Sequence, residues 1–322
     1  MSEYLNRAPG ALSWRYMTRR ELLAGAASAR MLWAKKRLDR SRISAITDEI
    51  GMSTDESIAF AKEYGIQWVE LRRVPEAKKD YTSLTEPELK AAAATLRNHG
   101  LRVSFLDASL MKFAWPGTDP VRKKPESDAA RNKRLAADAQ KFERRMEDLK
   151  TAISVAQIVG TDKVRVFTGS RVAEPMSVLP RVADVLGEMA LTAGKEGVQL
   201  LVENEASCNI ATCAELAALM KQLPSKSAGI NWDAQNGVPH KEEPFPYGYS
   251  LLPKKRIQNV HVKAKGVMEG SPDRLDWKGI MQALQKDGYE GKIGLETHIF
   301  DGTLIAAANT SMKEILRIVG EL

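Results

Sequence analysis

The stretch that decides the fold is Gly197–Glu205, GVQLLVENE. A glycine is followed by a run of apolar residues, and the run ends in an acid, an amide and a second acid. A short continuous apolar run of this kind is typical of a strand that is buried on both faces of a parallel sheet. The strand predicted here therefore ends in a carboxylate side chain, that of Glu203. If the pattern recurs along the chain, it predicts a functional site at the carboxyl edge of the sheet.

The pattern recurs from Ile43 to the C-terminus, where short apolar runs alternate with amphipathic segments. The predicted strands are Ile43–Ile46, Trp68–Leu71, Arg102–Phe105, Lys163–Phe167, Gln199–Val202, Gly229–Trp232, Val260–Val262 and Lys292–Leu295. The predicted helices are Thr54–Glu63, Glu86–Asn98, Ala137–Val159, Val178–Lys195, Ala214–Gln222, Trp277–Lys286 and Leu304–Val319, with a short segment near Tyr249–Leu252. Glycines such as Gly160 and Gly288 precede several strands, as expected for residues that end helices.

This alternation requires parallel strands joined by right-handed crossovers. Eight strand–helix units in roughly 250–280 residues is the size of a (β/α)₈ TIM barrel. A doubly wound sheet is disfavoured, because the segment after the first strand, Thr47–Gly51, carries no glycine-rich phosphate motif. We therefore predict an α/β fold, a single-domain TIM barrel over residues 43–322, after a basic leader over residues 1–42. The polar stretch Trp115–Asp138 is predicted to begin as a loop over the barrel mouth.

The charge of the chain lies in the leader. The 322 residues have a net charge of +7, and residues 1–42 hold 10 basic and 3 acidic side chains, so residues 43–322 are balanced. A balanced body argues against a nucleic-acid partner. The segment Met17–Ala29, MTRRELLAGAASA, resembles a twin-arginine export signal, which would place the protein in the periplasm. The alternative is a disordered or helical extension of a cytoplasmic protein, with Met17 as a second candidate start.

The sequence lacks the features of membrane-spanning, disulfide-rich and zinc-finger proteins. It has no apolar run near twenty residues, which argues against a membrane-spanning helix. Its two cysteines, Cys208 and Cys213, match neither a disulfide framework nor a zinc finger.

Four successive predicted strands end in residues that bind metals. Glu203, Asp233, His261 and Glu296 follow one another at intervals of about thirty residues. The carboxyl ends of barrel strands carry the active site in TIM barrels, and neighbouring strands lie about 4.8 Å apart. Three crowded carboxylates repel one another unless a cation holds them. Oxygen ligands with one imidazole suit a divalent ion such as Mn²⁺, Co²⁺, Zn²⁺ or Fe²⁺.

With these residues the chain resembles the sugar phosphate isomerase/epimerase superfamily, the xylose isomerase-like TIM barrels. The segments Val202-Glu203-Asn204, Trp232-Asp233, His261-Val262-Lys263 and Glu296-Thr297-His298 carry the resemblance, which spans about 85% of the chain. It implies one divalent metal ion, Mn²⁺ first and Co²⁺, Zn²⁺, Fe²⁺ or Mg²⁺ as alternatives, bound by Glu203, Asp233, His261 and Glu296. It also implies that Glu203 and Glu296 form the catalytic acid–base pair, and that homo-oligomers occur.

The resemblance implies a metal-dependent sugar isomerase or epimerase of carbohydrate metabolism, which abstracts a proton next to a carbonyl through a metal-stabilised enediolate. Its substrate is a small sugar or polyol. The residues predicted to bind this substrate are Lys263, Asn236, His298 and Glu70. Asn236 departs from the family, where many members have histidine three residues after the strand-6 aspartate. Ala264 stands where many have aspartate, and Val267 where epimerases have arginine. These departures leave the sugar open.

Two alternatives stay open, and a third is disfavoured. The same site could serve a dehydratase of a keto-polyol, similar to inosose dehydratase. The barrel could instead bind carbohydrate without catalysis. The apurinic endonucleases of the same fold need three zinc ions and more histidines than the four present here, His99, His240, His261 and His298.

Overall fold

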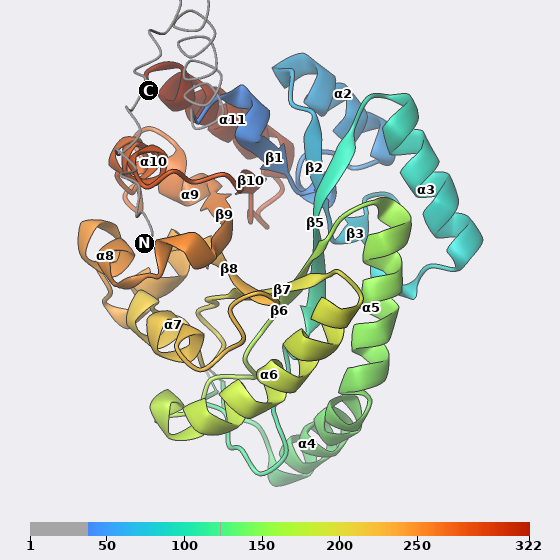
Figure 1. Cartoon of the computed structure of the whole chain (residues 1–322), viewed down its shortest axis with the longest axis vertical. Helices are drawn as coiled ribbons and strands as arrows, with labels where there is room; N and C mark the ends of the chain where they lie inside the picture. The colour runs from blue at the N-terminus through green and yellow to red at the C-terminus, as the bar shows by residue number, and fades with distance from the viewer. Residues whose placement is uncertain (1–37, 123) are drawn as a thin grey trace, which may run out of the picture. The chain divides into compact units, whose positions relative to one another are not determined.

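The predicted strands lie side by side and parallel in the computed structural model, which describes residues 38–122 and 124–322. The sheet order is β1, β10, β9, β8, β7, β6, β5, β2. Ile46, directly after β1, pairs with Glu70 of β2 in a parallel bridge, which closes the ring seen in Figure 1. The fold is therefore the expected (β/α)₈ barrel. The strand bounds are β1 Ile43–Ala45, β2 Trp68–Leu71, β5 Arg102–Leu110, β6 Lys163–Val166, β7 Gln199–Glu203, β8 Ala228–Asp233, β9 Ile257–Lys263 and β10 Lys292–Glu296.

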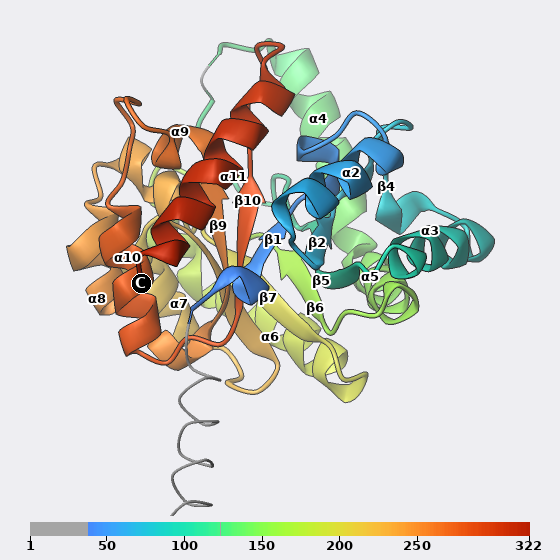
Figure 2. The same cartoon turned by 90° about the horizontal axis from the view of Figure 1, so that it is seen from above.

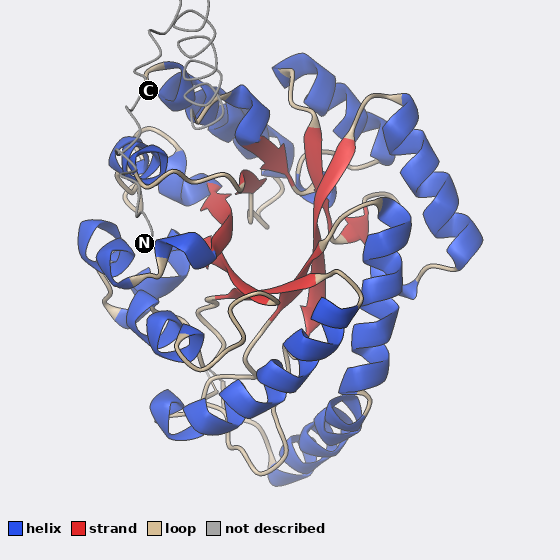
Figure 3. Ribbon diagram, viewed as in Figure 1, coloured by secondary structure: helices blue, strands red, loops and turns tan. Residues whose placement is uncertain are grey.

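Helices surround this ring, as Figure 3 shows in blue around the red strands. The helix bounds are α2 Thr54–Tyr64, α3 Glu86–Asn98, α4 Asp128–Glu143, α5 Arg145–Val159, α6 Leu179–Lys195, α7 Cys213–Met220, α8 Tyr249–Leu251, α9 Ala264–Val267, α10 Trp277–Lys286 and α11 Leu304–Gly320. Figure 2 views the same arrangement after a 90° turn. The apolar core lies between the strands and the helices, because side chains alternate along each strand. On β9, for example, buried Val260 and Val262 flank His261, which faces the interior of the ring.

Local signals set where helices begin and end. Ser53 caps α2 by accepting the N–H of Glu56 at 3.2 Å, and Thr212 and Glu215 form a capping box at the start of α7. Gly160 ends α5 in the left-handed conformation, with a φ of 85°. These signals fix where the helices begin and end between successive strands.

The main differences from the predicted boundaries are three. Strand β5 continues to Leu110, five residues beyond the predicted end. The predicted helix Ala137–Val159 is two helices, which meet at Arg144. Only Asp138 and Phe142 of α4 are buried, whereas α5 packs an apolar face against the core, so the two helices follow different surfaces. The Ser127 cap starts α4 at Asp128, within the stretch predicted as a loop.

A small antiparallel pair was also not predicted. It joins β3, Arg73–Val74, to β4, Lys79–Asp80, directly after β2.

The predicted leader falls almost entirely outside the described residues, and so does the twin-arginine segment Met17–Ala29. Of residues 1–42 the structure describes 38–42, where Arg40–Arg42 form a short 3₁₀ turn ahead of β1. Within the described part of the chain, no helix has both the length and the apolar character needed to cross a bilayer.

Candidate active site

A polar layer fills the carboxyl end of the barrel interior. Glu203 is the last residue of β7, and only 1% of it is exposed. Its Oε2 atom accepts from Asn231 Nδ2 at 2.8 Å and from Arg165 Nη1 at 3.1 Å. Asn231 stands opposite Glu203 in the register of β7 and β8, so the strand pairing itself brings the amide to the carboxylate. Glu203 is therefore held in one orientation by two donors from the neighbouring strands.

His261 occupies the centre of this layer. It is fully buried on β9, and its Nε2 atom lies 2.8 Å from Glu70 Oε2 across the ring. The other nitrogen, Nδ1, lies 3.6 Å from Glu203 Oε2 and 3.9 Å from Glu296 Oε2. Burial lowers the pKa of His261, but Glu70, Asp107 and Glu203 together raise it to about 10, so the ring is cationic at neutral pH and its Nδ1 side faces the two glutamates. A metal ion that replaced the Nδ1 proton would find this nitrogen at the carboxyl edge, with Glu70 holding the other ring nitrogen.

Gly294 provides the room for this contact. It pairs with His261 in the β9–β10 register, and a Cβ atom at Gly294 would lie 2.1 Å from Glu70 Oε1. The absence of a side chain there lets the Glu70 carboxylate reach the axis of the barrel. Ser44 and His261 both donate to this carboxylate, which is fully buried.

Glu296 and Lys263 are paired in the register of β10 and β9. Lys263 Nζ lies 2.8 Å from Asp233 Oδ2, 3.8 Å from Glu296 Oε2 and 2.7 Å from Asn236 Oδ1. Burial would raise the pKa of Glu296, but Lys263, His261 and Arg165 together hold that pKa well below its usual range. Glu296 is therefore a carboxylate at neutral pH, although it is only 5% exposed.

The structure brings three of the four predicted metal ligands together. Single ligand atoms of Glu203, His261 and Glu296 all lie within 4.8 Å of one another. Asp233, which is fully buried, is instead held by Lys263. Burial raises the pKa of Asp233 to about 6, although Lys263 opposes this shift.

The remaining predicted residues line the same region. Asn236 is buried, donates to the Asn204 carbonyl at 2.8 Å and accepts from Lys263, so both ends of its amide contact protein groups. His298 is exposed just after β10, in the left-handed region with a φ of 53°. Its backbone N–H donates to Glu49 Oε2 at 2.8 Å.

Several charged residues of the site were not singled out from the sequence. Asp107 is fully buried on β5 and lies 3.3 Å from Arg165 and 3.7 Å from His261. Burial raises the pKa of Asp107 well above its usual range. The missed signal was the length of β5, because the predicted strand ended at Phe105. Two further acidic residues that were not singled out, Asp48 and Glu49, follow β1, and each lies 2.8 Å from the Arg72 guanidinium.

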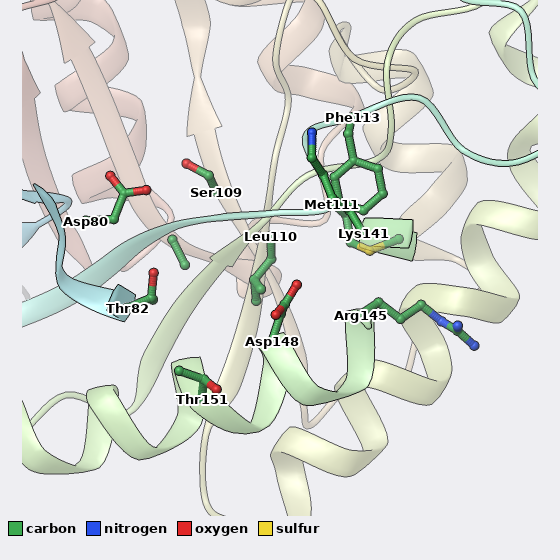
Figure 4. A pocket seen from close by; sticks show the side chains of 11 residues that line it. Asp80, Thr82, Ser109, Leu110, Met111, Phe113, Lys141, Arg145, Asp148 and Thr151 are labelled. Carbon is green, nitrogen blue, oxygen red and sulfur yellow. The ribbon is translucent and has the colours of Figure 1, made fainter. Parts of the chain in front are cut away.

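A separate cavity of about 260 Å³ lies beside the end of β5 (Figure 4). Asp148 and Thr151 of α5 lie along it, with Lys141 of α4 near Phe113. It contains none of the predicted site residues, so the carboxyl-edge layer remains the candidate active site.

The fold and this layer together define a TIM barrel with an acid–imidazole cluster at the carboxyl ends of its strands. The chain belongs to the xylose isomerase-like TIM barrel family, whose model matches residues 58–318. No curated protein sequence matches the chain.

Solved structures of low sequence identity share the fold. A xylose isomerase-like TIM barrel protein from Mycobacterium smegmatis, in complex with magnesium, is 16% identical, with a TM-score of 0.62 over 88% of this chain and 99% of that one. The 3-keto-D-glucoside 4-epimerase from E. coli is 15% identical, with a TM-score of 0.58 over 86% and 98%. The probable 3-DHS dehydratase of petrobactin synthesis from Bacillus anthracis is 15% identical, with a TM-score of 0.60 over 85% and 98%.

Proposed function

We propose that this protein is a divalent-metal-dependent isomerase or epimerase of a sugar or sugar derivative. The observation that carries the proposal is the convergence of Glu203, His261 and Glu296 from three strands onto one buried point, in a family whose structural neighbours include epimerases. Buried carboxylates at such close range are stable only when positive charge is placed among them.

The residues fit a divalent ion. Glu296 Oε2 is buried and makes no hydrogen bond within the described chain, which leaves it open as a ligand. Asp233 Oδ2 is ion-paired with Lys263 Nζ at 2.8 Å, and it would exchange this partner for the ion. Three carboxylates and one imidazole form a donor set suited to Mn²⁺, which we propose as the ion, with Co²⁺, Zn²⁺, Fe²⁺ and Mg²⁺ to be compared. When bound, such an ion polarises the substrate carbonyl and stabilises negative charge that develops on oxygen.

The chain's own side chains would move the proton. We assign proton abstraction and return at the carbon next to the carbonyl to Glu203 and Glu296, which stand on β7 and β10 on either side of the cluster. The low pKa of Glu296 keeps it ionised at neutral pH, the state that a base requires. Lys263 lies 3.8 Å from Glu296 and is positioned to donate to a substrate oxygen, and we include Asn236 and His298 as substrate contacts.

Glu70 takes a different role in this proposal from the substrate contact predicted from sequence. Its carboxylate is fully buried and lies 2.8 Å from His261 Nε2. A carboxylate behind a metal-binding histidine sets the orientation and tautomer of the ring. We therefore propose Glu70 as a positioning residue for His261.

Proton exchange tests the proposal. The protein with Mn²⁺ should exchange a C–H proton of a ketose or cyclic keto-polyol with D₂O, detected by NMR. Glu296→Gln should slow this exchange by about 10²–10⁴-fold while Mn²⁺ still binds, because the amide cannot accept the proton. Glu143→Gln, an exposed change on α4, serves as the control. Binding of sugars without any exchange would leave the barrel as a carbohydrate-binding module and sink the enzymatic proposal.

Dehydration is the second candidate, favoured by the similarity to the probable dehydratase. It starts with the same proton abstraction, after which a hydroxyl leaves the neighbouring carbon as water. Loss of one water from the product, measured by mass spectrometry, separates it from isomerisation, which conserves mass.

A further inference from the structure

The positive charges of the candidate active site already have partners. Four permanent cations reach the layer, and each contacts at least one carboxylate within 3.3 Å: Arg72 with Asp48 and Glu49, Lys112 with Glu205, Arg165 with Glu203 and Asp107, and Lys263 with Asp233. Phosphate is recognised in proteins by arginines and lysines with donors to spare. Among the described residues of this layer, the cations are engaged in balancing carboxylates.

The charge balance of the layer is negative. Eight carboxylates share it with those four cations: Asp48, Glu49, Glu70, Asp107, Glu203, Glu205, Asp233 and Glu296. Even with a divalent ion bound, which adds two positive charges to the four cations, the eight carboxylates outnumber the six positive charges. A neutral substrate leaves this balance unchanged, whereas a phosphate or carboxylate group adds negative charge to a poorly solvated site.

Lysines on the rim do not change this balance. Lys241 follows the β8 loop and Lys265 lies on α9, and both are exposed. Charges in contact with water are screened over about 8–10 Å at ordinary ionic strength, so their pull on a substrate inside the barrel is weak.

The rim offers an apolar contact instead. Phe300 follows β10 with 79% of the residue exposed, and its ring meets that of His298 edge-on at 4.7 Å. An exposed aromatic face beside hydrogen-bonding groups suits a ring that carries hydroxyls and C–H faces.

From these contacts we infer that the substrate is a neutral, unphosphorylated polyhydroxy carbonyl compound. The inference rests on the proposed function for the position of the reacting carbon. It goes further by excluding sugar phosphates and keto acids as the preferred substrates. Hydroxyl groups can be bound between paired charges, since each hydroxyl both donates and accepts.

Matched pairs of ligands test the inference on the full chain with Mn²⁺. A panel of neutral ketohexoses and cyclic keto-polyols is titrated beside their phosphate esters, with inorganic phosphate added to the neutral arm to equalise metal chelation. We expect at least one neutral member to bind at least about tenfold more tightly than its ester, measured by calorimetry. Equal or tighter binding of the esters, or no binding of any neutral member at millimolar concentration, would overturn the inference.

A charge variant sharpens the test. Glu205→Gln leaves Lys112, at 3.2 Å in the native chain, without its carboxylate beside the mouth. This change should lower the ratio of the affinity for a neutral ligand to the affinity for its phosphate ester by several-fold, because it leaves the Lys112 cation free to bind the phosphate. The control is Glu188→Gln on α6, which removes an ion pair with Arg145 at 3.6 Å away from the site. It should leave the affinity ratio unchanged. An unchanged preference in Glu205→Gln would contradict the charge argument.

The exchange assay keeps the two proposals apart. Tight binding of a neutral ligand without proton exchange would sink the proposed function and leave the substrate class standing. Proton exchange confined to phosphate esters would support the proposed function and overturn the inference that the substrate is neutral.

Discussion

At the scale of single residues, the site depends on orientation more than on residue type. Glutamates and lysines occur throughout the chain, but Glu70 and His261, 191 positions apart in sequence, meet at 2.8 Å inside the ring. Gly294 permits this contact by leaving space that a Cβ would fill. Side chains held by such partners lose little further freedom on binding a ligand, which is how a rigid scaffold makes a site.

Glu70→Gln is the prediction that belongs to this scale. The amide should weaken Mn²⁺ affinity about 10–100-fold, because a neutral acceptor holds the His261 ring less firmly in the required tautomer. Affinity is measured by competition with a fluorescent chelator, and circular dichroism checks that the barrel is intact. Glu143→Gln is again the control. Native affinity in an intact Glu70→Gln protein would remove Glu70 from the site.

At the scale of elements, glycines mark where helices stop. Gly160 ends α5 with a φ of 85°, and apart from its own chain neighbours no atom lies within 4 Å of the position that its Cβ would take. Gly187 lies within α6, also with open space around it. The two glycines therefore differ in backbone conformation rather than in packing, which makes them a matched pair.

Alanine should have opposite effects at these two positions. Gly160→Ala should lower the free energy of unfolding by about 1–2 kcal/mol, because an L-residue is strained in the left-handed region. Gly187→Ala should raise it by about 0.5–1 kcal/mol, because alanine loses less backbone entropy in a helix. Urea denaturation of both variants measures the difference. Two changes of the same sign would contradict the conformational explanation.

At the scale of the whole molecule, the two ends of the barrel carry different charge. The carboxyl end holds the acidic layer, whereas Lys292 opens β10 at the amino end near Arg42, Arg102 and Lys163. Burial first, and then these three cations, lower the pKa of Lys292 to about 8. The amino end is thus a region where positive charge costs stability.

This lowered pKa predicts a stability change with pH. Between pH 8 and an unfolded-state pKa near about 10.4, the unfolded chain binds a proton at Lys292 that the folded chain does not. The Lys292 contribution to stability therefore rises with pH across this window. Lys292→Met removes it, so the stability of the native chain relative to this variant should increase from pH 7.5 to 10. Chemical denaturation at several pH values measures the difference, in which all other titrating groups cancel. A constant difference would show that Lys292 titrates normally.

The sequence by itself determined the barrel and the carboxyl ends on which Glu203, Asp233, His261 and Glu296 stand. It could do so because strand periodicity and helix-ending glycines are local signals, and parallel strands put equivalent ends at one edge. Only the tertiary structure decided which charges pair. Asp107 joins the layer because β5 runs past its predicted end, Lys263 holds Asp233, and Glu70 turns to His261 rather than to the rim. These choices depend on contacts across the ring, between strands far apart in sequence, and no local pattern encodes them.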